Sequence, residues 1–149
     1  MDPSQPVPGQ GDGAFLAGIP AAAIDALAAA AGPDAETSPD SVEVRHLGGA
    51  LARPAPAGGA QPSIDASYLL YAAAAPPPAW SARCARVHAV KDALAPWHAS
   101  YDSYNFEDTP APAAAVLPPA SARRLQEIKA AYGPGQVNIS AHPVWPTRP

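Results

Sequence analysis

The chain has 149 residues, which allows one domain, and its formal net charge of −4 argues against nucleic-acid binding, which needs clustered Lys and Arg. Proline accounts for 21 residues, well above the usual frequency of about 5%, and only 15% of the residues are charged, so we expect part of the chain to be irregular. The single cysteine, Cys84, excludes an internal disulfide.

The N-terminal sequence MDPSQPVPGQGDG has neither the basic start nor the apolar run of a signal peptide. Asp25 interrupts the longest apolar run, so no segment predicts a membrane span. We therefore expect a cytoplasmic protein with no membrane contact.

The first part of the chain predicts a disordered tail followed by a helix. Residues 1–13 are mostly Pro, Gly, Gln and Ser, with almost nothing to bury, which is typical of disorder. Within residues 14–32, Pro20 suits the first turn of a helix and Gly32 suits its end. The weak apolar face of this helix would consist of Ile24, Leu27, Ala28 and Ala31.

Two strands are predicted in the middle of the chain. Residues 41–47 alternate apolar and polar side chains, as a half-buried strand does, and end at Gly48-Gly49. After a loop rich in Pro, Gly and Ala at 53–62, the aromatic and Leu residues of 67–73 predict the second strand. Tyr68 and Tyr71 would point to opposite faces of the sheet, so at most one faces a ligand.

Two further helices are predicted in the second half. Residues 79–94 place Trp80, Cys84, Val87 and Leu94 at helical spacing, with Pro96 as the stop. Residues 97–118 predict a loop and a Pro/Ala linker. A last helix at about 119–132 ends at Gly133-Pro134, and 135–149 should be irregular. The apolar face of that last helix would consist of Leu125, Ile128 and Tyr132.

These elements predict an α+β fold with a partial antiparallel sheet flanked by about three helices. Two strands do not make a stable sheet by themselves, and each helix has only one apolar stripe to cover. The pattern therefore indicates a piece of a larger α+β domain.

Three segments resemble, in order, the substrate domain of FAD-linked oxidoreductases of the berberine bridge enzyme family. They are SVEVRHLGGALARP, then APWHASYDSYNFED, which is similar to a stretch ending in Tyr-x-Asn-Phe, and ARRLQEIKAAYGPGQVNISAHPVWP, which is similar to the closing helix of the form RL-x-x-IK-x-x-Y. The resemblance assigns 14–146 to the C-terminal, substrate-side portion of such an enzyme and leaves 147–149 as a tail.

The resemblance implies a cofactor and a set of site residues. In this family FAD is held by an N-terminal domain, and an alcohol or amine substrate passes hydride to the flavin, with oxygen as the usual acceptor. Because the chain lacks the Gly-rich pyrophosphate loop of that domain, we do not expect it to hold FAD alone. Asn105 is the implied cofactor contact, and Tyr101 and Tyr104 are candidate catalytic groups or substrate walls.

Each candidate has a plainer explanation. Asn105 could simply form an Asx turn, and the two tyrosines could be packing aromatics beside Trp97. The charged side chains of the last helix, with Arg123 and Glu127 four residues apart, are typical of a solvated face. The histidines have no ligand spacing and predict no metal site; they are His46, His88, His98 and His142.

Three hypotheses follow from the sequence. The first is a substrate-side portion of an FAD-dependent oxidoreductase, as a truncated gene product or one half of a split enzyme, inactive until a separate flavin-binding domain joins it. The second is a non-enzymatic module that pairs with itself or with another protein through its sheet, because unpaired edges favour pairing. The third is a mostly disordered Pro/Ala-rich chain.

Overall fold

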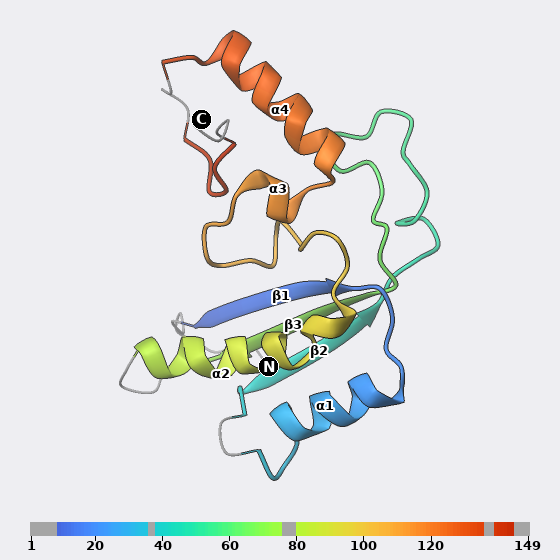
Figure 1. Ribbon diagram of the computed structural model, residues 1–149, viewed down its shortest axis with the longest axis vertical. Coiled ribbons are helices and arrows are strands. Elements are labelled where there is room, and N and C mark those ends of the chain that lie inside the picture. The colour runs from blue at the N-terminus through green and yellow to red at the C-terminus, as the bar shows by residue number, and fades with distance from the viewer. Residues whose placement is uncertain (1–8, 36–37, 76–79, 136–138, 145–149) are drawn as a thin grey trace, which may run out of the picture.

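A three-stranded antiparallel sheet forms the centre of the protein (Figure 1). The computed structural model describes residues 9–35, 38–75, 80–135 and 139–144, except for the side chains of 80–84. The strands β1 (Gln10–Leu16), β2 (Ser41–His46) and β3 (Tyr68–Ala74) lie in the order β1-β3-β2, so the last strand in sequence is the central one. The predicted α+β class and both predicted strands are confirmed, while the third hypothesis, a mostly disordered chain, is wrong for the described residues.

Strand β1 corrects the prediction of a disordered tail. Residues 10–13 are paired with β3 and buried, in register from Gln10 opposite Ala74 to Leu16 opposite Tyr68. The predicted tail segments 1–8 and 147–149 lie outside the described residues. The sheet therefore has three strands rather than two, which meets the usual minimum for independent stability.

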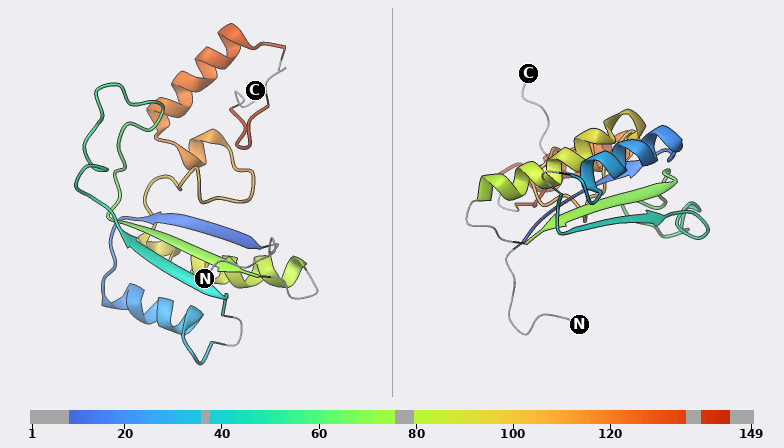
Figure 2. Two further views of the ribbon diagram at one scale, coloured as in Figure 1. Left: turned by 180° about the vertical axis from the view of Figure 1, so that it is seen from behind. Right: turned by 90° about the horizontal axis from the view of Figure 1, so that it is seen from below.

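Helices α1 (Ala21–Ala31) and α2 (Trp80–Ala93) cover one face of the sheet (Figure 2). The predicted boundaries of α1 are confirmed, with Pro20 as the N-cap and Gly32 as the C-cap. The core between the helices and this face is fully enclosed, and its largest buried side chains are Leu16, Leu70, Val87, Val90 and Leu94.

The predicted apolar face of α1 is only partly correct. Ala23 is the residue of α1 that is fully buried, whereas Ile24 is 56% exposed. Ala26, Leu27 and Ala30 pack against the core from the same side. The buried stripe is thus shifted from the predicted one and consists mainly of alanine, which lets α1 lie close to its neighbours.

The segment that follows the short helix η1 (Ala95–Trp97) crosses to the other face of the sheet. On its way it covers the outer edge of β1: the Ala17 N–H donates to the Trp97 carbonyl at 2.9 Å, and the Ala99 N–H donates to the Phe15 carbonyl at 2.7 Å. A second, smaller core forms on this face from Phe15, Leu69 and Tyr101. Strand β1 is therefore enclosed on both edges.

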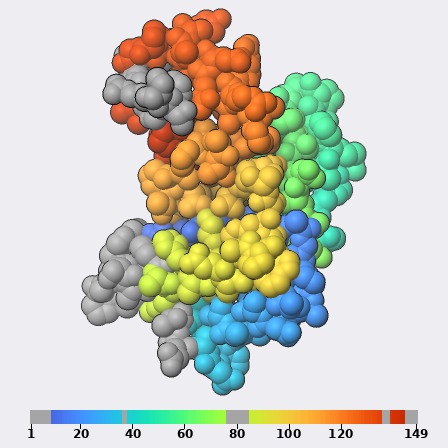
Figure 3. All heavy atoms as spheres, in the orientation of Figure 1, coloured from blue at the N-terminus to red at the C-terminus, as the bar shows by residue number. Residues whose placement is uncertain are grey.

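The chain from residue 101 on lies beside the sheet and contains α3 (Ala113–Val116) and α4 (Pro119–Tyr132) (Figures 1 and 3). We call this part the C-terminal half of the molecule. Helix α3 falls in the predicted Pro/Ala linker, and α4 confirms the predicted last helix. Its core consists of small or medium side chains: Ala113, Val116, Leu117 and Ala122.

The apolar face predicted for α4 is also only partly buried. Leu125 packs against the C-terminal core, but Tyr132 is 88% exposed and Ile128 is exposed as well. The ion pair on this helix joins Arg124 to Glu127 at 3.0 Å, not the predicted Arg123 to Glu127. No helix in the described part of the chain is long and apolar enough to cross a membrane.

Candidate functional site

A cavity of about 380 Å³ lies between α4, the 60–61 loop and the 104–105 segment. Its volume is at the lower end of the range of about 300–1,000 Å³ that is typical of small-molecule sites. The walls are mostly apolar, with two side-chain amides and one phenol among them. The lining residues are Ala60, Gln61, Tyr104, Asn105, Leu117, Leu125 and Val144.

The amide of Gln61 has an unusual environment in this wall. Its Nε2 atom is buried, and no hydrogen-bond partner for it exists among the described residues. Buried polar groups are nearly always hydrogen-bonded, and a buried donor without a partner costs about 1–3 kcal/mol. Because this nitrogen is buried, the side chain must rotate into the cavity before Nε2 can donate to an oxygen acceptor of a ligand.

Two of the three residues selected from the sequence meet at this cavity. Tyr104 and Asn105 both line it, and Asn105 is exposed to solvent. The Tyr104 ring packs edge-on against His142 with centroids 4.7 Å apart, and the Tyr104 carbonyl accepts a hydrogen bond from His142 Nε2 at 3.1 Å. His142 Nδ1 in turn accepts from the Ala111 N–H at 3.1 Å, so the buried imidazole fixes the wall that carries Tyr104.

Tyr101 lies elsewhere. It is buried in the core on the far face of the sheet, with its ring edge-on to Phe15 at 5.6 Å. Its hydroxyl oxygen accepts a long hydrogen bond of 3.4 Å from the Asp65 N–H. Tyr101 therefore does not line the cavity with Tyr104, and its surroundings match the packing role that was its plainer explanation.

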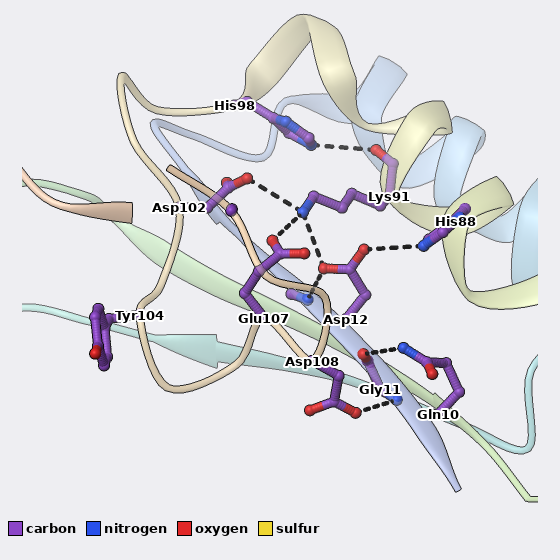
Figure 4. A network of polar contacts seen from close by, with 12 residues as sticks. Gln10, Gly11, Asp12, His88, Lys91, His98, Asp102, Tyr104, Glu107 and Asp108 are labelled. Atoms are coloured by element: carbon purple, nitrogen blue, oxygen red, sulfur yellow. Dashed lines mark hydrogen bonds and ion pairs between the residues drawn. The ribbon is translucent and has the colours of Figure 1, made fainter. Parts of the chain in front are cut away.

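A second polar cluster, centred on Lys91, was not predicted (Figure 4). The Lys91 ammonium of α2 contacts Glu107 Oε2 at 2.6 Å, Asp12 Oδ1 at 2.9 Å and Asp102 Oδ2 at 3.2 Å. The side chains of Asp12 and Glu107 are only 4% and 8% exposed. His88 Nε2 lies 3.5 Å from the other oxygen of Asp12. We call Asp12, Lys91, Asp102 and Glu107 the Lys91 cluster.

Burial and charge act in opposite directions on the Lys91 cluster. Burial alone would lower the pKa of Lys91, but hydrogen bonds to Glu107 and Asp12 and the nearby carboxylate charges outweigh it and raise that pKa above its usual range. Burial raises the pKa of Glu107, and the Asp12 carboxylate adds to this, while Lys91 opposes it. One ammonium thus lies among three carboxylates, whose negative charge exceeds its own.

The Lys91 cluster joins segments that are far apart in sequence. It connects β1, α2 and the 101–108 segment, and Asp108 strengthens the link by accepting the Gly11 N–H at 2.7 Å. In the described part of the chain, no group of His, Cys, Asp and Glu side chains could hold a metal ion. The role supported by this geometry is positional, because the cluster holds the segment that contains Tyr104 and Asn105.

The face of the sheet opposite the helices carries one of the two strand tyrosines. Tyr71 packs edge-on against Phe106 at 5.3 Å, and the Arg45 guanidinium lies 5.0 Å from the same ring. Burial, with the charge of Asp108 next, raises the pKa of Tyr71, which argues against a role as a base. Tyr68 contributes to the opposite, helix-covered face, as predicted.

The comparisons with known proteins identify no family for this chain. No family model matches the chain, and no curated protein shows significant similarity to it. The resemblance to berberine-bridge-type enzymes therefore stays a prediction.

The described residues do not fit FAD. Pyrophosphate groups are usually bound by free N–H donors at a helix N-terminus. Pro118 is the N-cap of α4 and Pro119 is its first residue, so proline removes two donors at this helix start. The cavity of about 380 Å³ is of a size for a small ligand rather than a dinucleotide. We derive no chemical step through the flavin.

Proposed function

We propose that this chain is the substrate-side portion of an FAD-dependent oxidoreductase of the berberine bridge enzyme type, with the flavin held by a separate domain. The observation that carries the proposal is the cavity that brings Tyr104 and Asn105 together with the unpaired amide of Gln61. The substrate class is a small alcohol or amine, whose oxidation would deliver hydride to the flavin.

The residues of this chain would bind and orient that substrate. After rotation of its side chain, Gln61 would donate a hydrogen bond from Nε2 to a substrate oxygen, and the exposed amide of Asn105 would provide a second contact at the mouth. The apolar wall of Leu117 and Leu125 would exclude water from the carbon skeleton. An alcohol is favoured over an amine at the Gln61 position because an amide N–H needs an acceptor.

The surface of α4 supports a separate domain as partner. Tyr132 and Ile128 are exposed on this helix, next to a second hollow lined by Ala60, Arg124 and Leu125. Exposed apolar residues that gather on one helix are typical of an interaction surface. We assign this surface to the flavin-binding domain.

The experiment that tests the proposal is a ligand-observed and protein-observed NMR screen with small alcohols, amines and polyols. We expect alcohols to shift the amide resonances of Tyr104 and Asn105. A matched variant, Gln61→Leu, should lose this binding but gain stability, because it removes the unpaired donor. A role of Gln61 in folding alone would instead lower stability.

Two outcomes would overturn the proposal. One is a screen in which no alcohol or amine perturbs the cavity residues. The other is a flavin absorbance band that stays with the protein after incubation with excess FAD and desalting, because the assignment of FAD to a separate domain would then be wrong.

A further inference from the structure

The outer edge of β2 is open. Strand β2 pairs with β3 on one side only, and most of its residues are exposed, including the apolar Val44 at 37%. No backbone hydrogen bond from another described segment reaches its outer edge, whereas β1, at the opposite edge, is covered by the segment that begins at Trp97. Figure 2 shows β2 at the border of the sheet. Open edges of this kind pair with further strands.

The hydrogen-bond pattern identifies which backbone groups point outward. The Leu47 N–H donates to the Ser67 carbonyl at 2.8 Å, so the backbone of Leu47 faces β3. Because successive residues of a strand alternate in this direction, the N–H and C=O groups of Val42, Val44 and His46 face away from β3.

We propose that this edge binds the same edge of a second copy, antiparallel and with a two-fold axis at Val44. In this register Val44 faces Val44 of the second copy, and Val42 faces His46. These are the outward-facing residues, so each such pair can exchange two backbone hydrogen bonds. The result is a six-stranded antiparallel sheet.

In this register, each charged side chain of β2 faces an opposite charge on the second copy. Glu43 of each copy faces Arg45 of the other, at the positions where side chains of an antiparallel pair come closest. Within one copy, Glu43 and Arg45 already bond through two contacts of 2.6 and 2.8 Å, and both side chains remain about half exposed, at 48% and 45%. The dimer would therefore carry four charges of alternating sign in a two-by-two arrangement on one face of the sheet. Moving the axis to Glu43 or Arg45 would place like charges opposite each other.

Apolar side chains at the same edge favour a second copy as the occupant. In the single chain α1 lies beside β2 (Figures 1 and 2). The two-fold axis would therefore place α1 of both copies on one face of the extended sheet. There, Ile24 of α1 and Val44 of β2 are exposed in the single chain. Burial of these side chains would add to the backbone and charge pairing. This inference does not depend on the proposed substrate role.

The test uses charge reversal in the full chain, with molar mass measured by light scattering over a wide range of protein concentration. We expect a dimer for the wild type. Glu43→Arg and Arg45→Glu should each weaken dimerisation by at least about tenfold, because each opposes two pairs of like charges. An equimolar mixture of the two variants should form a heterodimer, because every Arg then faces a Glu.

Matched controls lie on α4. Glu127→Arg and Arg124→Glu make the same charge changes in another exposed ion pair and should leave the dimer intact. A wild type that stays monomeric at all concentrations would overturn the inference, and the edge would then belong to another strand. A dimer that survives both β2 variants, or a mixture that does not recover pairing, would overturn the proposed register.

Discussion

The sheet half of the molecule and the C-terminal half use their apolar residues differently. In the sheet half, Leu16, Leu70 and Leu94 are fully buried between the strands and the helices. In the C-terminal half the core is built largely from Ala113, Val116 and Ala122, and a cavity of about 380 Å³ stays open beside it. One half is therefore closed around its own core, and the other leaves room for a ligand.

The Lys91 cluster lies where these two halves meet. It fixes the 101–108 segment to β1 and α2. That segment contains Tyr104 and Asn105, which form part of the cavity wall. Because the sheet half has the closed core and the C-terminal half has the cavity, we expect the sheet and its helices to provide most of the stability and the C-terminal half to provide the binding site. The predictions that follow test this division, from the largest expected effect to the smallest.

Lys91→Met should have the largest effect. The substitution leaves Asp12 and Glu107 buried without their cation, and breaking a buried ion pair in this way costs about 3–5 kcal/mol. Urea denaturation measures the loss. Arg123→Met on the exposed face of α4 is the control and should change stability by less than about 0.5 kcal/mol.

A combined variant separates charge from packing at the same place. Adding Asp12→Asn and Glu107→Gln to Lys91→Met should recover much of the lost stability, because no buried charge is then left unpaired. A loss of under about 1 kcal/mol for Lys91→Met alone would show that water reaches the cluster and that the halves are joined by other contacts.

Leu70→Ala and Leu117→Ala compare the two cores directly. Leu70 is fully buried on the central strand, and its truncation should cost about 3–5 kcal/mol. Leu117 adjoins the existing cavity, so it has fewer contacts to lose, and its truncation should cost about 2–3 kcal/mol. Denaturation midpoints with unchanged slopes check both values. Equal losses would contradict the division into a closed and an open half.

The elements that the sequence predicted correctly are those with local signals. Proline and glycine mark both ends of α1, and alternation marks β2. The predicted face of α4 was wrong beyond Leu125 because periodicity shows that Ile128 and Tyr132 share a face but not that any segment covers it.

Strand β1 was missed because its glycines are required by contacts that only the fold reveals. A Cβ at Gly11 would lie 2.1 Å from the Tyr71 hydroxyl oxygen, and a Cβ at Gly13 would lie 2.9 Å from the Leu70 carbonyl oxygen. Glycine in a strand often marks such a close approach. In sequence, the same Gly-Asp-Gly reads as a flexible tail.

The candidate site was likewise only partly predictable, because some of its contacts join residues that are far apart in sequence. Tyr104 and Asn105 follow from a motif that lies within a few residues, but Gln61 comes from a loop without periodicity. Lys91 is separated from Asp12 by 79 residues, and no local pattern connects them. The available signal was a lysine beside Val87 and Leu94 on the predicted apolar face of the helix.

His142→Ala should affect the C-terminal half alone. The substitution removes the ring that accepts the Ala111 N–H and donates to the Tyr104 carbonyl, at a cost of about 1–3 kcal/mol. Hydrogen exchange should become faster at Ala113, whose N–H donates to the Pro143 carbonyl, and stay slow in β3.

His142→Gln is the matched control for this variant. A glutamine side chain carries both an NH2 donor group and a carbonyl acceptor and should recover part of the protection at Ala113. Equal loss of protection in β3 would show that the halves unfold as one unit and that the division does not hold.

Glu107→Gln gives the smallest effect, and it appears as a pH dependence. Burial raises the pKa of Glu107 above its ordinary value of 4.5, so its protonated form favours the folded state. That contribution is complete below about pH 4.5 and is lost as the pH rises through the raised value. Relative to Glu107→Gln, the wild type should therefore lose stability as the pH increases from 4.5 toward neutral.

Urea midpoints of both proteins over this pH range measure the difference, with Glu127→Gln as the control for removing one exposed carboxylate. A difference that grows in favour of the wild type with rising pH would mean that the Lys91 ammonium outweighs burial at Glu107. The Lys91 cluster would then be a balanced ion pair rather than one cation among too many carboxylates, and the junction would hold the two halves together more firmly at neutral pH than in acid.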